Sequence, residues 1–301
     1  MWICLSYGMP YDSTSIVRSH PDPVQLESAC RDVRLAVMRA AAIAGIGHYG
    51  PALSAVEILV TLYHGLLDVD PTRPDRPDRD RFILSKGHAC SALYPILVDL
   101  GFFEAGLLET FTRLGSPLGD HPDLRKVPGI DFSSGSLGHG PSIAIGMVEG
   151  MRLQGIDGRV VVVIGDGEQN EGQVWEAAAY AGHNKLANLM VICDRNGVCV
   201  DGRTEDVLSV EPMADRWRAF GWHVVELDGH DTAQLLGAYQ DFDARRGMPG
   251  ASPTMVIATT VSGRGIDFIE GSADWHLGYL AGEDHDEAVR QIASVVGADP
   301  A

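Results

Sequence analysis

Apolar runs and amphipathic stretches alternate through the second half of the chain. The run RVVVVIG at 159–165 is β-branched and ends in glycine, which is typical of a strand buried on both faces. The later elements continue the alternation: strands at 189–194, 222–229 and 254–260, and helices at 171–185, 212–219 and 231–245. Because strand–helix–strand repeats form right-handed crossovers, this order predicts an α/β fold, a doubly wound parallel sheet with helices on both faces.

The first half is predicted to be mainly helical. From Val24 to Ala44, apolar residues recur at steps of three and four, as on one face of a helix. A charged, proline-rich loop at 70–81 precedes the short strand RFILS. The remaining segments are helices at 53–67, 89–100 and 104–112, and a long loop at 114–140. We expect residues 1–22 to form a flexible extension, and 23–301 to form one domain with a loop-rich C-terminal tail.

Two neighbouring strand ends carry oxygen ligands. The strand at 159–165 continues into Asp166-Gly167-Glu168, and the strand at 189–194 continues into Asn196-Gly197-Val198. Adjacent parallel strands would place Asp166 beside Asn196. A carboxylate, an amide oxygen and a backbone carbonyl suit Mg²⁺, with Ca²⁺ as a substitute. Either segment alone is most often a simple turn, so the prediction depends on finding both.

Composition narrows the partners and the compartment. The 301 residues include 23 Lys and Arg against 41 Asp and Glu, a net charge of −18, which argues against nucleic acid or an anionic membrane surface as the partner. Neither a membrane-spanning run nor a signal-peptide pattern is visible, and the five cysteines form no CxxC pair. We therefore expect a cytoplasmic protein with reduced thiols.

Together the motifs resemble those of a known family. GDG, followed by 28 residues (168–195) and Asn196, matches the thiamine-diphosphate motif in the form found in transketolases. Further segments match that family in order: GIGHYGP at 45–51, LSKGHACSALY at 84–94, GDHPD at 119–123, SSGSLGHG at 133–140, FGWHVVELDGH at 220–230 and ADWH at 273–276. From Val24 to His276 the chain resembles the N-terminal, diphosphate-binding half of a transketolase. The resemblance implies the thiamine-diphosphate-binding fold.

The same resemblance implies roles for single residues. The metal would be held by Asp166, Asn196 and the carbonyl of Val198. Contacts to thiamine diphosphate would come from His88, Gly135, Ser136, Leu137, Gly165, Asp166, Gly167, Glu168, Asn196 and His276. The residues implied in catalysis are His48, His121, His276 and Glu171, the last by contacting the cofactor-activating glutamate of another domain. Imidazoles, whose pKa lies near neutrality, suit proton transfer at sugar hydroxyls, although a lone loop histidine is usually an ordinary surface residue.

The resemblance also implies a separate partner chain. About 25 residues follow His276, too few for the pyrimidine-binding domain that carries the activating glutamate in this family. His139, where long-chain transketolases commonly have glutamine, is typical of two-subunit forms. We expect a separate C-terminal subunit in an α2β2 heterotetramer. The implied reaction transfers a two-carbon ketol (glycolaldehyde) unit from a ketose donor to an aldehyde acceptor.

Departures from the family pattern keep alternatives open. Tyr49, Ser262 and Leu277 replace residues that border the cofactor and donor channel in the family. One alternative is therefore a specialised two-carbon (glycolyl) transferase of a secondary pathway, which acts on an unusual acceptor or a carrier-protein thiol. Others are the α subunit of a 2-oxo acid dehydrogenase and a non-catalytic scaffold subunit. Lys86 is equally compatible with a phosphate contact and with a solvated side chain, and His230 is assigned to an ordinary hydrogen-bonded position.

Overall fold

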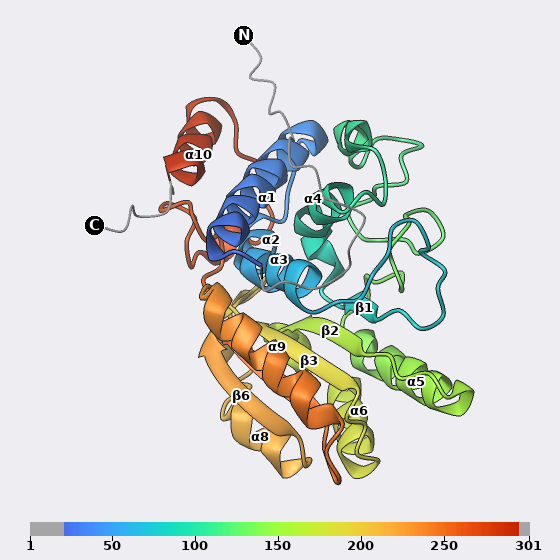
Figure 1. Ribbon diagram of the computed structural model, residues 1–301. Helices are drawn as coiled ribbons and strands as arrows, with labels where there is room; N and C mark the ends of the chain where they lie inside the picture. Colours follow the sequence, from blue (N-terminus) through green and yellow to red (C-terminus); the bar gives the residue numbers. More distant parts are fainter. Residues whose placement is uncertain (1–20, 295–301) are drawn as a thin grey trace.

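The computed structural model describes residues 21–294, within which five parallel strands form one sheet (Figure 1). The strands are β1 (Arg81–Leu84), β2 (Val160–Gly165), β3 (Leu189–Arg195), β6 (His223–Asp228) and β7 (Thr254–Thr259), and their order is β1-β2-β3-β7-β6. A short antiparallel hairpin, β4 (Val198–Cys199) and β5 (Gly202–Arg203), follows β3. The predicted parallel α/β sheet is confirmed. The expected extension at 1–22 lies almost wholly outside the described residues.

Helices cover both faces of this sheet (Figure 1). One layer consists of α5 (His139–Gln154), α6 (Gly172–His183) and α8 (Met213–Ala219), which share a core with Val160, Val162 and Ile164. The other layer contains α1 (Pro23–Ala44), α2 (Tyr49–Ser54), α3 (Val56–Gly65), α4 (Cys90–Asp99), α9 (Thr232–Arg246) and α10 (Gly282–Ser294). Val161 and Val163 point into that second core. Alternate β2 side chains thus enter opposite cores, which explains the unbroken apolar run.

The strand order determines which helix lies on which face. The chain steps in one direction from β1 through β2 and β3 to β6, and then turns back to β7. Right-handed crossovers therefore place α5, α6 and α8 on one face, and place α9, which connects β6 to β7, on the other. The carboxyl ends of β2, β3 and β7 all open at one edge of the sheet, where ligands bind in folds of this kind.

Several elements differ from the sequence expectations. The helix expected at 53–67 is two helices, α2 and α3, separated at Ala55, and the helix expected at 104–112 is a 3-10 turn, η2 (Ala105–Thr110). Helix α5 was not expected, because Gly140, Gly146 and Gly150 interrupt its apolar pattern. The C-terminal tail forms loops only as far as 281, since α10 follows. Helix α10 is polar overall and buries only Ala288 and Ile292 among its side chains.

The short elements and the cysteines complete the description. Helix α7 (Thr204–Val207) and the 3-10 turns η1 (Gly87–Ala89), η3 (Gly167–Asn170) and η4 (Ala273–Trp275) all lie in connections. In the described part of the chain, Cys30, Cys90, Cys193 and Cys199 are free thiols, as expected. Between residues 21 and 294, no helix has the length and apolar character needed to cross a membrane.

Candidate active site

The proposed metal ligands lie at the ends of two paired strands. The register of β2 and β3 pairs Gly165 with Asp194, so Asp166 and the 196–198 turn meet directly. The carboxylate of Asp166, only 2% exposed, accepts hydrogen bonds from the Gly167 amide at 2.8 Å and from the Gly197 amide at 2.7 Å. Gly197 has φ of +76°, which lets the chain turn back toward the carboxylate. The expectation that Asp166 lies beside the asparagine turn is confirmed.

The environment of Asp166 fits a cation. The pKa of this carboxyl is raised to about 6: burial is the largest cause and the nearby Asp194 adds to it, whereas the two backbone hydrogen bonds and the charge of Lys86 act in the opposite direction. A bound cation would reverse that shift, because an opposite charge favours the ionised form. Within residues 21–294, no group of three or more His, Cys, Asp or Glu side chains could hold a metal. A metal here would thus depend on one carboxylate, one amide oxygen, a carbonyl and oxygens of the ligand itself, a hard donor set suited to Mg²⁺.

Beside these ligands the protein surface is hollowed. A cavity of about 240 Å³ has Asp166, Asn196, Gly197, Thr204 and Thr260 among its lining residues. Among the lining residues, Asp166 directly follows β2, Arg195 is the last residue of β3 and Thr259 is the last residue of β7, so the cavity lies where parallel strands end. This place matches the ligand position expected for an open α/β sheet.

Glu168 joins three segments around the site. Its buried carboxylate accepts hydrogen bonds from the Ser85 hydroxyl, from the Gly138 amide at 2.8 Å and from the Gly165 amide at 3.0 Å. Burial raises the pKa of Glu168, while these hydrogen bonds lower it. These contacts hold the loop before α5 against the end of β2. The cofactor contact expected of Glu168 stays a prediction.

The loop before α5 presents its small residues outward. Gly135 and Ser136 are exposed, and the carbonyl of Leu137 accepts a hydrogen bond from the Gln173 side chain at 3.4 Å. Glu171, also exposed, precedes α6, and a Cβ placed on Gly138 would lie 2.6 Å from its Cβ. The loop and the start of α6 therefore approach closely enough to require glycine at 138.

Four histidines from separate loops gather in one cluster. The ring centroid of His48 lies 5.3 Å from that of His88, 6.2 Å from that of His121 and 6.0 Å from that of His276. His88 and His276 are likewise 5.3 Å apart. Nδ1 of His48 lies 3.3 Å from a carboxylate oxygen of Asp120, a neighbour to which the sequence patterns assign no role. The structure thus brings together all four histidines that the sequence singled out.

The surroundings of His88, His121 and His276 favour the neutral form of these three imidazoles. The pKa of His88 lies well below its ordinary value and that of His276 is lowered to about 4; burial is the largest cause for both, and the charge of Lys86 contributes to both. Burial also lowers the pKa of His121, against the opposing effect of Asp120. A neutral imidazole carries one donor and one acceptor nitrogen. The cluster can therefore accept a proton as well as donate a hydrogen bond.

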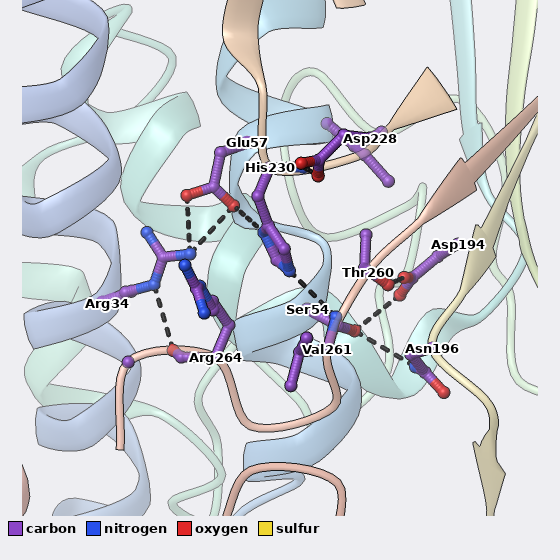
Figure 2. A network of polar contacts seen from close by, with 12 residues as sticks. Arg34, Ser54, Glu57, Asp194, Asn196, Asp228, His230, Thr260, Val261 and Arg264 are labelled. Carbon is purple, nitrogen blue, oxygen red and sulfur yellow. Dashed lines mark hydrogen bonds and ion pairs between the residues drawn. The ribbon is translucent and has the colours of Figure 1, made fainter. Parts of the chain in front are cut away.

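A buried polar network lies behind the proposed metal ligands, and Figure 2 shows part of it. Lys86, 2% exposed, forms an ion pair with Asp194, which is fully buried. Asp194 also accepts hydrogen bonds from the hydroxyls of Thr260 and Ser54, the latter at 2.6 Å, and Ser54 in turn accepts one from the Asn196 amide at 3.2 Å. A solvated Lys86 is therefore ruled out. Asp194 was not singled out from the sequence. Its position two residues before Asn196, near the end of β3, was the feature of the sequence that could have identified it.

Of the three departures from the family pattern, one reaches the surface. Tyr49 is fully buried, where its hydroxyl accepts a hydrogen bond from the Leu280 amide at 3.3 Å, and Ser262 is 1% exposed. Leu277 is 41% exposed and directly follows His276. Only Leu277 therefore stands at the surface beside the histidine cluster.

Comparison with known proteins identifies two groups of similar chains: some close to this chain in length and others more than twice as long. The family model "Transketolase, thiamine diphosphate binding domain" matches residues 26–301. The chain is 41% identical to the 6-deoxy-6-sulfo-D-fructose transketolase subunit SqwG of Clostridium sp. (strain MSTE9), covering 82% of this chain and 89% of that protein. It is 39% identical to an apulose-4-phosphate transketolase subunit of Phocaeicola vulgatus, covering 82% of this chain and 86% of that protein.

Solved structures show the same fold in longer chains. The transketolase of Pichia stipitis in complex with sedoheptulose 7-phosphate matches with a TM-score of 0.81 and 30% identity over 89% of this chain. The Campylobacter jejuni transketolase matches with a TM-score of 0.81 and 27% identity over 90% of this chain. The match spans only 40% and 43% of those two chains, respectively.

Proposed function

The chain belongs to the transketolase family, and from this premise we propose that it is the diphosphate-binding subunit of a two-chain transketolase. One observation carries the proposal: the chain covers 89% and 86% of two relatives named as transketolase subunits, but 40% of a longer solved transketolase. The reaction would transfer a two-carbon ketol unit from a ketose donor to an aldehyde acceptor. Intact metal ligands and four clustered histidines support an enzyme rather than a scaffold.

In this proposal the strand ends hold the cofactor through a metal. Asp166, Asn196 and the carbonyl of Val198 would bind Mg²⁺, or Ca²⁺ as a substitute. Gly135, Ser136, Leu137, Gly165, Gly167, Glu168, His88 and His276 would line the thiamine diphosphate. When bound, that cofactor supplies a nucleophilic carbon and an electron sink. The cation would give the buried Asp166 the opposite charge that its protein surroundings provide only in part.

The histidine cluster would manage protons on the substrate. His121 and His276 would exchange protons with substrate hydroxyls, His48 would stabilise reacting oxygens, and His88 would donate a hydrogen bond to the diphosphate. Burial holds the pKa values of His88 and His276 low in the free chain. A bound polyanion would raise them toward neutrality, because negative charge favours the imidazolium. The imidazoles would then work near physiological pH.

The site is completed in this proposal by a C-terminal subunit. That subunit would carry the pyrimidine-binding domain and the activating glutamate, which the exposed Glu171 at the start of α6 would contact. We propose an α2β2 heterotetramer with each active site between two chains. The charge of −18 does not attract an anionic cofactor, so binding would depend on local groups.

Reconstitution tests the two-chain proposal. The chain is purified alone and together with a candidate partner that has a pyrimidine-domain pattern, and both samples are assayed for ketol transfer with Mg²⁺ and thiamine diphosphate. We expect turnover only in the mixture, and a mass of two copies of each chain by light scattering. Robust turnover by the chain alone would refute the split site.

A second candidate keeps the chemistry but changes the substrate. The exposed Leu277 beside His276 and the two different ketoses named for the relatives favour a specialised two-carbon transferase. Its acceptor would be an unusual aldehyde or a carrier-protein thiol. The reconstituted pair is offered a common ketose phosphate, a 6-deoxy-6-sulfo ketose and an apulose phosphate, each with aldehyde or thiol acceptors. Preference for the common ketose phosphate and an aldose acceptor would argue against this candidate.

A further inference from the structure

The segment 260–264 connects the two halves of the candidate site. At its start, the Thr260 hydroxyl donates to Asp194, and the Thr260 amide donates to the carbonyl of Arg195 at 3.1 Å. Further on, the Gly263 amide donates to the carbonyl of Gly50 at 3.1 Å, two residues from His48. The conformation of this segment therefore affects the strand end that carries Asn196 and the loop that carries His48.

His230 binds this segment through its backbone (Figure 2). It follows β6, its side chain is 12% exposed, and its Nε2 lies 2.9 Å from the Val261 amide nitrogen. Its Nδ1 lies 2.9 Å from a carboxylate oxygen of Glu57 on α3. A backbone amide can only donate, so Nε2 must be the acceptor and the proton must lie on Nδ1, which donates to Glu57. The contacts thus select one neutral tautomer.

Arg34 extends the network to the other end of the segment. Its guanidinium on α1 forms an ion pair with Glu57 at 2.6 Å, and its Nε donates to the carbonyl of Arg264 at 3.2 Å. Burial alone would raise the pKa of Glu57, but Arg34 and the hydrogen bond from His230 lower it below its ordinary value. Arg34 as a cation, Glu57 as an anion and a neutral His230 together bury no net charge. The network binds two backbone groups of the segment, the Val261 amide and the Arg264 carbonyl.

We propose that His230 is a positioning residue, which with Glu57 and Arg34 holds the 260–264 segment in the conformation that the site requires. The imidazole nitrogens of His230 contact Glu57 and the Val261 amide, so its effect on the site passes through Val261. The consequence for cofactor binding rests on the proposed function, whereas the effect on the segment does not. If His230 were only an ordinary hydrogen-bonded side chain, loss of the acceptor at Nε2 would not change the conformation of the 260–264 segment.

Two substitutions separate the contacts of this imidazole. In His230→Gln the amide oxygen reaches the position of Nε2 and retains an acceptor for the Val261 amide. In His230→Asn the shorter amide reaches the position of Nδ1, so the contact to Glu57 is retained and the Val261 amide is left without its acceptor. The exposed His183, changed to Asn, serves as the matched control.

Amide hydrogen exchange of the full chain reports on the segment directly. We expect residues 260–264 to exchange about tenfold faster in His230→Asn, because a buried donor loses its partner. Exchange in His230→Gln and in His183→Asn should stay within about threefold of the unchanged chain. Equal acceleration in the two His230 variants, or unchanged exchange in His230→Asn, would overturn the proposal. If His230→Asn does not fold, Arg34→Lys serves instead, because it loses the donor to the Arg264 carbonyl. Amide exchange of residues 260–264 should then be faster in Arg34→Lys, and unchanged exchange in that variant would overturn the proposal.

Calorimetry with Mg²⁺ and thiamine diphosphate on the reconstituted complex measures the consequence for the site. We expect His230→Asn to weaken cofactor binding about tenfold, with donor KM at saturating cofactor nearly unchanged, and His230→Gln to restore affinity. Cofactor affinity unchanged in His230→Asn would overturn the link from segment to site. Failure of the unchanged complex to transfer ketol units would instead refute the proposed function and leave the exchange result standing.

Discussion

Replacing Asp166 with asparagine should separate stability from metal binding. The carboxyl has an ordinary pKa of 3.8, and burial raises it to about 6 in the folded chain. That difference corresponds to about 3 kcal/mol, which the metal-free fold loses when Asp166 ionises. Because the folded pKa is raised, this contribution is fully present below pH 3.8 and is lost as pH rises through about 6. About 2 kcal/mol of it should disappear between about pH 4 and about pH 7.

Asparagine removes the ionisation but accepts through one oxygen only. One of the two amides that now donate to Asp166, Gly167 or Gly197, loses its acceptor at a cost of about 1–3 kcal/mol. At about pH 7 the metal-free Asp166→Asn chain should therefore be as stable as the unchanged chain or up to about 2 kcal/mol more stable. Most substitutions of a fully buried residue destabilise instead.

Urea unfolding of both chains between about pH 4 and about pH 7, without metal, measures this difference. The unchanged chain should lose about 2 kcal/mol relative to Asp166→Asn across that range. With Mg²⁺ and thiamine diphosphate at about 100 times their Kd, the unchanged chain with its partner should gain about 2.7 kcal/mol and the variant almost nothing. A pH-independent difference, or a variant more than about 2 kcal/mol less stable at neutral pH, would refute the reasoning about Asp166.

Three further predictions concern the surroundings of the site. Lys86→Met should lower the free energy of unfolding, measured in urea, by about 3–5 kcal/mol, because Asp194 is left as an unpaired buried charge. Adding Asp194→Asn should recover part of that loss. Unchanged stability of the Lys86→Met variant would contradict the ion pair. The imidazole of His276 should titrate by NMR near pH 4 rather than 6.5, and its midpoint should rise in any folded Lys86→Met chain, since the lysine charge contributes to the lowering; a midpoint near the ordinary value would show that the ring is solvated. Tyr49→Phe should destabilise the chain by about 1 kcal/mol in thermal or urea unfolding, because the buried Leu280 amide loses its acceptor. Tyr180→Phe, on the exposed surface of α6, is the control. An equal loss of stability in Tyr180→Phe would show that the loss in Tyr49→Phe does not come from the Leu280 contact.

Local patterns were sufficient for the sheet and for the position of Asp166 beside the 196–198 turn. The run at 159–165 signals a strand buried on both faces, and the order of strands and helices implies parallel pairing. Parallel pairing in register then places Asp166 beside the 196–198 turn without further information. Two helices were not predicted from the sequence: α5, where glycines interrupt the apolar pattern, and α10, which is polar overall and buries only Ala288 and Ile292.

By itself, the sequence determined the layered α/β fold and the residue types able to bind a metal and transfer protons, because periodicity and strand ends are local properties. Only the tertiary structure decided how distant loops meet: it gathered His48 and His276 with centroids 6.0 Å apart, and it buried Lys86 against Asp194. It also turned His230, an ordinary histidine by its sequence context, toward the backbone of the site. The physical reason is that burial and hydrogen-bond partners depend on which loops fold over the sheet edge, and no short stretch of residues encodes that packing.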